Sequence, residues 1–141
     1  MRVVAFNGSP RKEGNTAMLL RKVLSPIARA GIDTELVQVG GVAVRGCTAC
    51  YHCMETKDKR CAIKTDPVNE WIGKMVEADA IVMGSPSYFS GLTPELKALV
   101  DRAGLVAVAN DRMFSRKIGA AVAAHRRGGA VCVVDQINHL F

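Results

Sequence analysis

The chain has few aromatic residues, no long apolar run and no block of basic charge. It contains one tryptophan, two tyrosines and four phenylalanines. Although the formal net charge is +6, the basic residues are scattered, and no basic helix is interleaved with aromatics. A nucleic-acid partner is therefore not predicted. No segment approaches the apolar length that crosses a bilayer, so no membrane association is predicted. The sequence contains no internal repeat and no Ser-His-Asp set.

The length and composition indicate one domain with a substantial core. The chain has 141 residues, of which 49% are hydrophobic. The first strand-like run starts at the N-terminus, so no signal peptide is expected and the predicted location is the cytoplasm. Five cysteines are present, and a disulfide framework is not expected in such a chain.

Strand-like and helix-like segments alternate, which predicts an α/β fold with a parallel sheet and right-handed crossovers. The apolar runs predict strands near residues 3–6, 33–39, 80–84 and 117–124. Helices are predicted over 15–30, from Asp66 onward, over 94–109 and over 130–140. Gly31 is expected to end the first helix, Asp66 and Thr93 to cap the next two, and Cys132 to be a buried small residue.

The most informative segment is GSPRKEGNT, residues 8–16, which follows the first strand and opens the first helix. A glycine-containing loop in this place presents backbone N–H groups and the positive end of a helix dipole. An anion, most often a phosphate, is the natural ligand of such a loop. The alternative is an ordinary strand–turn–helix junction.

Two further loops, SPSYFSG at residues 85–91 and HRRGG at 125–129, follow the third and fourth predicted strands. Ligands of open parallel sheets bind beyond the carboxyl ends of the strands, where the strand order reverses. We therefore expect these two loops and the first loop to lie side by side.

GSPRKEGNT and SPSYFSGLTP resemble the two flavin loops of the NADPH-dependent FMN reductase family. The resemblance implies a flavodoxin-like three-layer sandwich with four or five parallel strands in the order 2-1-3-4(-5). It also implies FMN as the cofactor. The residues that match the family's cofactor-binding loops are Ser9, Arg11, Asn15, Thr16, Pro86, Ser87, Tyr88, Phe89, Ser90, Gly91, His125 and Gly128.

The function implied by this resemblance is an FMN-dependent oxidoreductase. Its donor would be NAD(P)H or a reduced ferredoxin-type carrier, and its acceptor a quinone, a flavin or another small molecule. No catalytic side chain is assigned, because the flavin itself carries the chemistry. One alternative is a pure electron carrier with no substrate of its own. Another is a metal-stabilised module that binds a different nucleotide.

Four cysteines form a compact motif, Cys47-x2-Cys50-x2-Cys53-x7-Cys61. Thiolates at this spacing can close around a cubane cluster or a single zinc ion, and free redox-active thiols are the third alternative. The motif resembles that of the iron–sulfur flavoproteins, a branch of the same family. This resemblance implies a [4Fe–4S] cluster held by these four residues.

The family pattern continues beyond the fourth strand with a fifth strand and a last helix, which residues 1–141 lack. The expectation is a single flavodoxin-like FMN-binding domain over residues 1–141, and three alternatives stay open: the chain is truncated, a partner completes the sheet edge, or the sheet has four strands. Because an uncovered edge strand promotes association, a homo-oligomer, dimer or tetramer, is predicted.

Overall fold

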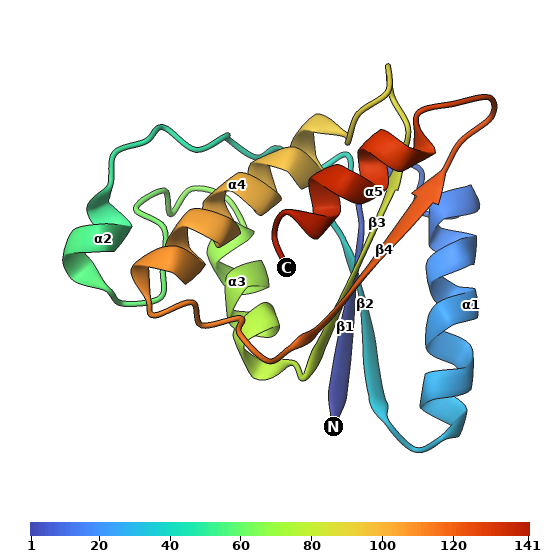
Figure 1. Cartoon of the computed structure of the whole chain (residues 1–141), viewed down its shortest axis with the longest axis horizontal. Coiled ribbons are helices and arrows are strands. Elements are labelled where there is room, and N and C mark those ends of the chain that lie inside the picture. The colour runs from blue at the N-terminus through green and yellow to red at the C-terminus, as the bar shows by residue number, and fades with distance from the viewer.

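A four-stranded parallel sheet lies between helices on its two faces (Figure 1). The computed structural model describes residues 1–141. In chain order the elements are β1 (Arg2–Asn7), α1 (Asn15–Arg29), β2 (Asp33–Gln38), α2 (His52–Thr56), α3 (Val68–Glu77), β3 (Ala80–Pro86), α4 (Pro94–Ala109), β4 (Ile118–Ala124) and α5 (Ala130–Asn138). The strand order is β2-β1-β3-β4, which confirms the predicted order 2-1-3-4.

Strand β1 is buried because both of its faces are covered. Val3 and Ala5 face α1 and pack with Leu20 and Leu24 of that helix. Val4 and Phe6 face the opposite way and belong to the larger core cluster. A strand covered on both faces has no polar alternation, which is why this run is continuously apolar.

The larger core lies between the sheet and the helices α3, α4 and α5. Ile72 of α3, Leu96 and Leu99 of α4 and Ile137 of α5 are all fully buried there. The handedness of parallel crossovers explains why α1 and α4 lie on opposite faces. The chain moves in one direction from β1 to β2 and in the other from β3 to β4, so right-handed connections place the two helices on opposite sides.

Three predicted details differ from the structure. Helix α3 begins at Val68 with Pro67 at the N-cap position, so Asp66 lies one residue earlier; its Oδ1 accepts from the Val68 N–H at 3.3 Å while its Oδ2 pairs with Arg102. Thr93 is the N-cap residue of α4, but its hydroxyl makes no hydrogen bond to the first turn of the helix. It donates instead to the carbonyl of Gly8, in the loop after β1. Cys132 is exposed, because α5 packs through the neighbouring Val133.

The connection between β2 and α3 contains a short helix, α2, that no sequence pattern indicated. Gly31 ends α1 with a φ of 80°, which confirms its predicted role. None of the helices combines the length and the apolar character that a membrane span requires. At the free edge of the sheet, Ile118 of β4 is 63% exposed. The predicted homo-oligomer stays a prediction.

Gly40 lets the end of β2 pass directly against the loop that follows β1. Its N–H and that of Val39 both donate to the carbonyl of Asn7, at 3.0 and 2.9 Å. A Cβ atom at position 40 would lie 2.3 Å from the carbonyl oxygen of Gly8, well inside van der Waals contact. No side chain fits there without displacing that loop.

Gly40→Ala should therefore destabilise the protein by roughly 1–3 kcal/mol, the usual range for overpacking. The matched control is Gly73→Ala in α3, where a Cβ would meet nothing within 4 Å. This control should stabilise the protein by about 0.5–1 kcal/mol, because alanine is the better helix former. Chemical denaturation of the two variants measures both effects. Equal stability of the two variants would contradict the close approach at Gly40.

Candidate functional site

The loops that follow β1, β3 and β4 meet at the carboxyl edge of the sheet and enclose a cavity of about 440 Å³. We call it the carboxyl-edge cavity. Its volume is within the range of small-molecule sites. It is lined by Ser9, Arg11, Gly14, Asn15, Thr16, Pro86, Ser87, Tyr88, Ala124, His125 and Arg126. The structure thus brings together eight predicted site residues: Ser9, Arg11, Asn15, Thr16, Pro86, Ser87, Tyr88 and His125.

Hydrogen bonds from three neighbouring segments hold the loop after β1. The N–H of Gly8 donates to the carbonyl of Gly84 in β3 at 2.7 Å. The Thr93 hydroxyl at the start of α4 donates to the Gly8 carbonyl at 2.7 Å, and the side chain of Gln38 donates to the Ser9 carbonyl at 2.7 Å. The loop is therefore fixed before any ligand binds.

The carboxyl-edge cavity is electropositive. Helix α1 starts with Gly14 as its N-cap, and no side chain caps its first turn, so the N–H groups of that turn remain available. Arg11 and Arg126 add positive charge, and no acidic residue lines the cavity. The hydroxyl of Ser9 accepts a bond from the Arg11 N–H at 3.2 Å, which leaves its proton free to donate. These groups suit an anionic ligand.

The loop after β3 forms a two-residue turn. Tyr88 and Gly91 exchange backbone hydrogen bonds at 3.1 Å, and the φ values of Phe89 and Ser90 between them are 48° and 62°. Two successive positive φ angles are typical of a type I′ turn. The Phe89 side chain at its tip is completely exposed. Phe89, Ser90 and Gly91 do not line the cavity.

The main-chain N–H groups at the base of this loop already have partners. The N–H of Ser87 donates to the Ala124 carbonyl at 2.9 Å, and that of Tyr88 bonds Gly91. This loop therefore offers a ligand the Ser87 hydroxyl and the Tyr88 ring, and not these two amides. Gly128, also a predicted site residue, lies outside the cavity.

The cavity also contains three residues absent from the predicted set: Gly14, Ala124 and Arg126. Gly14 lies inside the GSPRKEGNT motif, so the motif could have indicated it. Arg126 is one of two consecutive arginines, and no local pattern distinguishes it from Arg127.

The four cysteines of the compact motif line one small cavity beside α4, which we call the cysteine cavity. All of them are free thiols; Cys47 and Cys50 are exposed, Cys61 is partly buried and Cys53 is buried. Burial raises the pKa of the Cys53 thiol, and the nearby thiols of Cys61 and Cys50 raise it further.

Arg102 of α4 forms one wall of the cysteine cavity. Its side chain is wholly buried and pairs with Asp66 through Nη1 and Oδ2 at 2.6 Å. The guanidinium also donates to the carbonyls of Arg45 and Ile63 at 3.1 and 3.0 Å and to the sulfur of Cys61 at 3.2 Å. Burial alone would raise the pKa of Asp66, but the bonds from Arg102 and the Arg45 amide outweigh burial and lower it.

We call residues 45–63 the cysteine segment, and two asparagines bond its C-terminal part. Asn69 of α3 accepts from the Cys61 N–H at 2.7 Å and donates to the Cys61 and Ile63 carbonyls at 2.9 and 3.0 Å. Asn110 accepts from the Lys59 N–H at 3.1 Å. Polar side chains of α3 and of α4 with its C-cap Asn110 thus bond the main chain at Arg45, Lys59, Cys61 and Ile63.

The four cysteines line one cavity, but they are not arranged as a formed metal site. No group of three or more His, Cys, Asp and Glu side chains has the arrangement that holds a metal ion. Four zinc–sulfur bonds of about 2.3 Å would bring tetrahedral sulfurs to about 3.8 Å from one another. An iron–sulfur cluster is wider, because iron and sulfide lie between the cysteine sulfurs, and four thiolates are its usual ligands.

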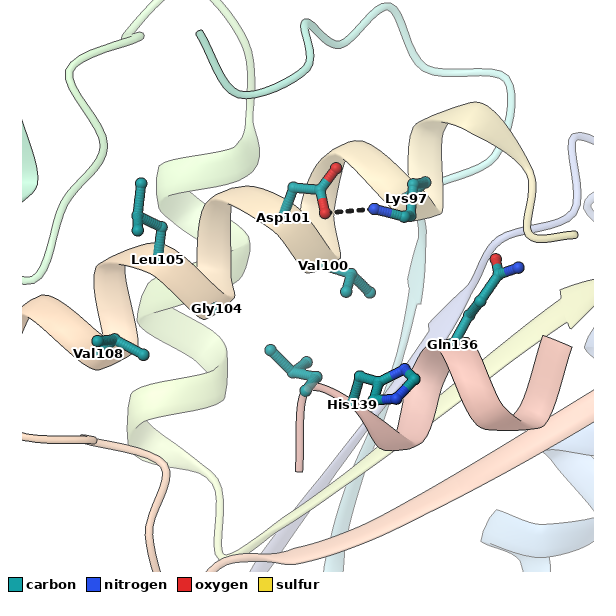
Figure 2. Close-up of a pocket in the computed structure, with 9 residues that line it drawn as sticks. Lys97, Val100, Asp101, Gly104, Leu105, Val108, Gln136 and His139 are labelled. Atoms are coloured by element: carbon teal, nitrogen blue, oxygen red, sulfur yellow. Dashed lines mark hydrogen bonds and ion pairs between the residues drawn. The ribbon is translucent and has the colours of Figure 1, made fainter. Parts of the chain in front are cut away.

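A separate groove of about 360 Å³ lies between α4 and α5 (Figure 2). The ion pair of Lys97 and Asp101 lies on its α4 side, and Gln136 and His139 lie on its α5 side. None of the predicted site residues lines this groove.

A family model described as NADPH-dependent FMN reductase matches residues 1–141. The chain belongs to the NADPH-dependent FMN reductase family. The resemblance inferred from GSPRKEGNT and SPSYFSGLTP is thereby confirmed. As a member of this family, the chain is a flavin-dependent redox protein.

Among curated members of related sequence, an iron-sulfur flavoprotein of Methanocaldococcus jannaschii is 40% identical over 143 residues, which cover 100% of this chain and 72% of that protein. An iron-sulfur flavoprotein of Archaeoglobus fulgidus is 33% identical over 129 residues, covering 92% of this chain and 62% of that protein. The chain therefore spans between 62% and 72% of the length of these two relatives.

Solved structures support the fold of this family member. A flavone reductase has a TM-score of 0.73 at 16% identity, and the match covers 99% of this chain and 49% of that chain. The Trp repressor binding protein from Bacillus subtilis has a TM-score of 0.67 at 18% identity, covering 99% and 77%. At such identities the likeness shows the fold alone, and the predicted flavodoxin-like sandwich is confirmed.

The exposure of the cysteines predicts how fast they react in metal-free protein. Ellman's reagent should modify Cys47, Cys50 and Cys132 first and Cys53 last, because a buried thiol with a raised pKa is both inaccessible and protonated. Mass spectrometry of the modified protein assigns each site. Cys132→Ser is the control, since it should remove one fast-reacting thiol and leave the slow one unchanged. Rapid modification of Cys53 would contradict its burial.

Proposed function

We propose that residues 1–141 form a single FMN-binding domain whose carboxyl-edge cavity holds the flavin. The observation that carries this proposal is the uncapped start of α1, which faces a basic cavity without acidic residues. The description of its family, which names FMN, supports the same ligand. When bound, FMN supplies hydride and single-electron transfer.

The phosphate of FMN would bind at the start of α1. Ser9 and Thr16 are buried and supply hydroxyl donors, and Asn15 supplies a side-chain amide. Arg11 neutralises the phosphate charge from the same loop. Each charge-assisted hydrogen bond of this kind contributes about 1.5–3 kcal/mol. The hydrogen bonds that fix the loop reduce the entropy lost on binding.

The flavin ring would lie toward the loops after β3 and β4. Tyr88 contributes a half-exposed aromatic surface, and Ser87 and His125 contribute polar groups. Arg126 places a positive charge beside this part of the cavity. A cation stabilises negative charge that develops on a bound group in a partly desolvated site.

We further propose that Cys47, Cys50, Cys53 and Cys61 hold a [4Fe–4S] cluster. All four line the cysteine cavity, and several relatives carry the name iron-sulfur flavoprotein. The carboxyl-edge cavity and the cysteine cavity share no residue. Loss of the cluster should therefore leave FMN bound, and loss of FMN should leave the cluster bound.

The donor would be NAD(P)H or a reduced ferredoxin-type carrier, and the acceptor a quinone, a flavin or another small molecule. The second candidate is a pure electron carrier, which the cysteine cavity favours because a cluster transfers single electrons. Sustained NAD(P)H oxidation with an added quinone supports the enzyme. Exchange with a reduced carrier without NAD(P)H turnover supports the carrier.

Ser9→Asp should weaken FMN binding at least tenfold, because a carboxylate would face the phosphate in a buried loop. A lost charge-assisted bond alone corresponds to one to two decades in affinity. Titration of the flavin-free protein with FMN, followed by flavin fluorescence, measures the change. Ser115→Asp adds the same charge at an exposed turn outside the cavity and should leave the affinity unchanged. Equal affinity of both variants would mean that the phosphate binds elsewhere.

Cys50→Ala should abolish iron and acid-labile sulfide while FMN binding persists. The matched control is Cys132→Ala, which removes an exposed thiol outside the cysteine cavity and should keep both groups. The proteins are purified without oxygen and assayed for iron, sulfide and released flavin. Anaerobic wild-type protein without iron would rule out the cluster. Iron that persists in Cys50→Ala would rule out this ligand set.

A further inference from the structure

Arg102 joins the two ends of the cysteine segment. It bonds the carbonyl of Arg45, two residues before the first cysteine, and that of Ile63, two residues after the last one. It pairs with Asp66 through the same guanidinium. A single buried cation on α4 therefore sets the distance between both ends of the segment.

The guanidinium also donates to a sulfur atom. Its Nε lies 3.2 Å from the Sγ of Cys61, on the edge of the fork that does not face Asp66. Among the four cysteines, Cys47 accepts only a backbone N–H at 3.4 Å, and no other sulfur accepts a bond from a charged group. Cys61 is thus the one ligand candidate with a cationic hydrogen-bond donor.

We propose that Arg102 is a positioning residue of the cysteine cavity that raises the reduction potential of the cluster through Cys61. This inference rests on the proposed [4Fe–4S] cluster. Reduction adds one negative charge, and a hydrogen bond to a ligand sulfur together with a buried cation favours the reduced state. Asp66 offsets part of the cationic charge but leaves the N–H···S bond in place.

Arginine suits this position because its planar fork has separate donors for a carboxylate, two carbonyls and a sulfur. A lysine keeps the charge but cannot make these four contacts together. Packing alone does not require a cation here, since a buried ion pair is often no more stabilising than apolar residues of the same volume. The four contacts therefore indicate a role beyond packing.

The test compares three variants with the wild-type protein, all reconstituted without oxygen. The double variant Arg102→Met with Asp66→Asn removes the cation without leaving an unpaired buried carboxylate. Arg102→Lys keeps the charge and loses the fork. Lys97→Gln is the matched control, because it removes one positive charge from an exposed position on the same helix (Figure 2).

Potentiometric titration follows the reduction of the cluster by electron paramagnetic resonance and the reduction of FMN by visible absorbance. In the double variant the reduction potential of the cluster should fall by at least about 59 mV. For a one-electron couple this makes the oxidised cluster tenfold more favoured. Arg102→Lys should give a smaller shift in the same direction. The FMN potential should not change in any variant, and Lys97→Gln should match the wild type.

An unchanged cluster potential in an iron-containing double variant would overturn the inference while leaving the proposed function intact. If the double variant loses its iron, the cluster potential of Arg102→Lys is compared with the wild type instead, and an unchanged potential there overturns the inference. Wild-type protein that binds no iron and sulfide would instead overturn the proposed cluster, and this inference with it.

Discussion

The pairing of β1 with β3 is the contact on which the candidate sites depend. It ends in the 2.7 Å bond from the N–H of Gly8 to the carbonyl of Gly84, which ties the loop after β1 to the neighbouring strand. At this point the chain connections diverge to opposite faces of the sheet, so the loops splay apart and leave a cavity. A shift of β1 against β3 would separate the start of α1 from the loop after β3.

Helix α4 connects the two cavities mechanically. Its N-cap residue, Thr93, donates to the carbonyl of Gly8 in the first loop, and its buried Arg102 forms part of the cysteine cavity. Arg102 lies eight positions after Pro94, which corresponds to about 12 Å along the helix. The apolar face of α4 packs against the sheet, so one helix lines the cysteine cavity and, through its N-cap, supports a loop of the carboxyl-edge cavity.

The segment between β2 and α3 is ordered mainly by polar contacts. Its buried apolar contribution is small, and Cys53 is the one cysteine of the motif that is buried in the core. Asn69, Arg102 and Asn110 bond the Cys61 N–H, the Arg45 carbonyl and the Lys59 N–H of this segment. Most of these bonds act on the main chain; among the four sulfurs only those of Cys61 and Cys47 accept a bond, from Arg102 and from the Ala49 N–H.

The strand order was expected only from the resemblance to the FMN reductase family. The sequence by itself determined the α/β class and the three loops that meet at the carboxyl edge. These follow from local apolar runs and from the fixed handedness of parallel crossovers, which need no knowledge of side-chain partners. Only the tertiary structure decided which side chains in and beside those loops face the cavity and which face solvent. The turn after Tyr88 places Phe89 in solvent, and the packing of α1 leaves Met18 on the exposed side. Arg102 lies 41 positions from Cys61 in the sequence, and no local pattern links the two. Their contact exists because α4 crosses the cysteine segment, and such a contact is a property of packing between distant elements.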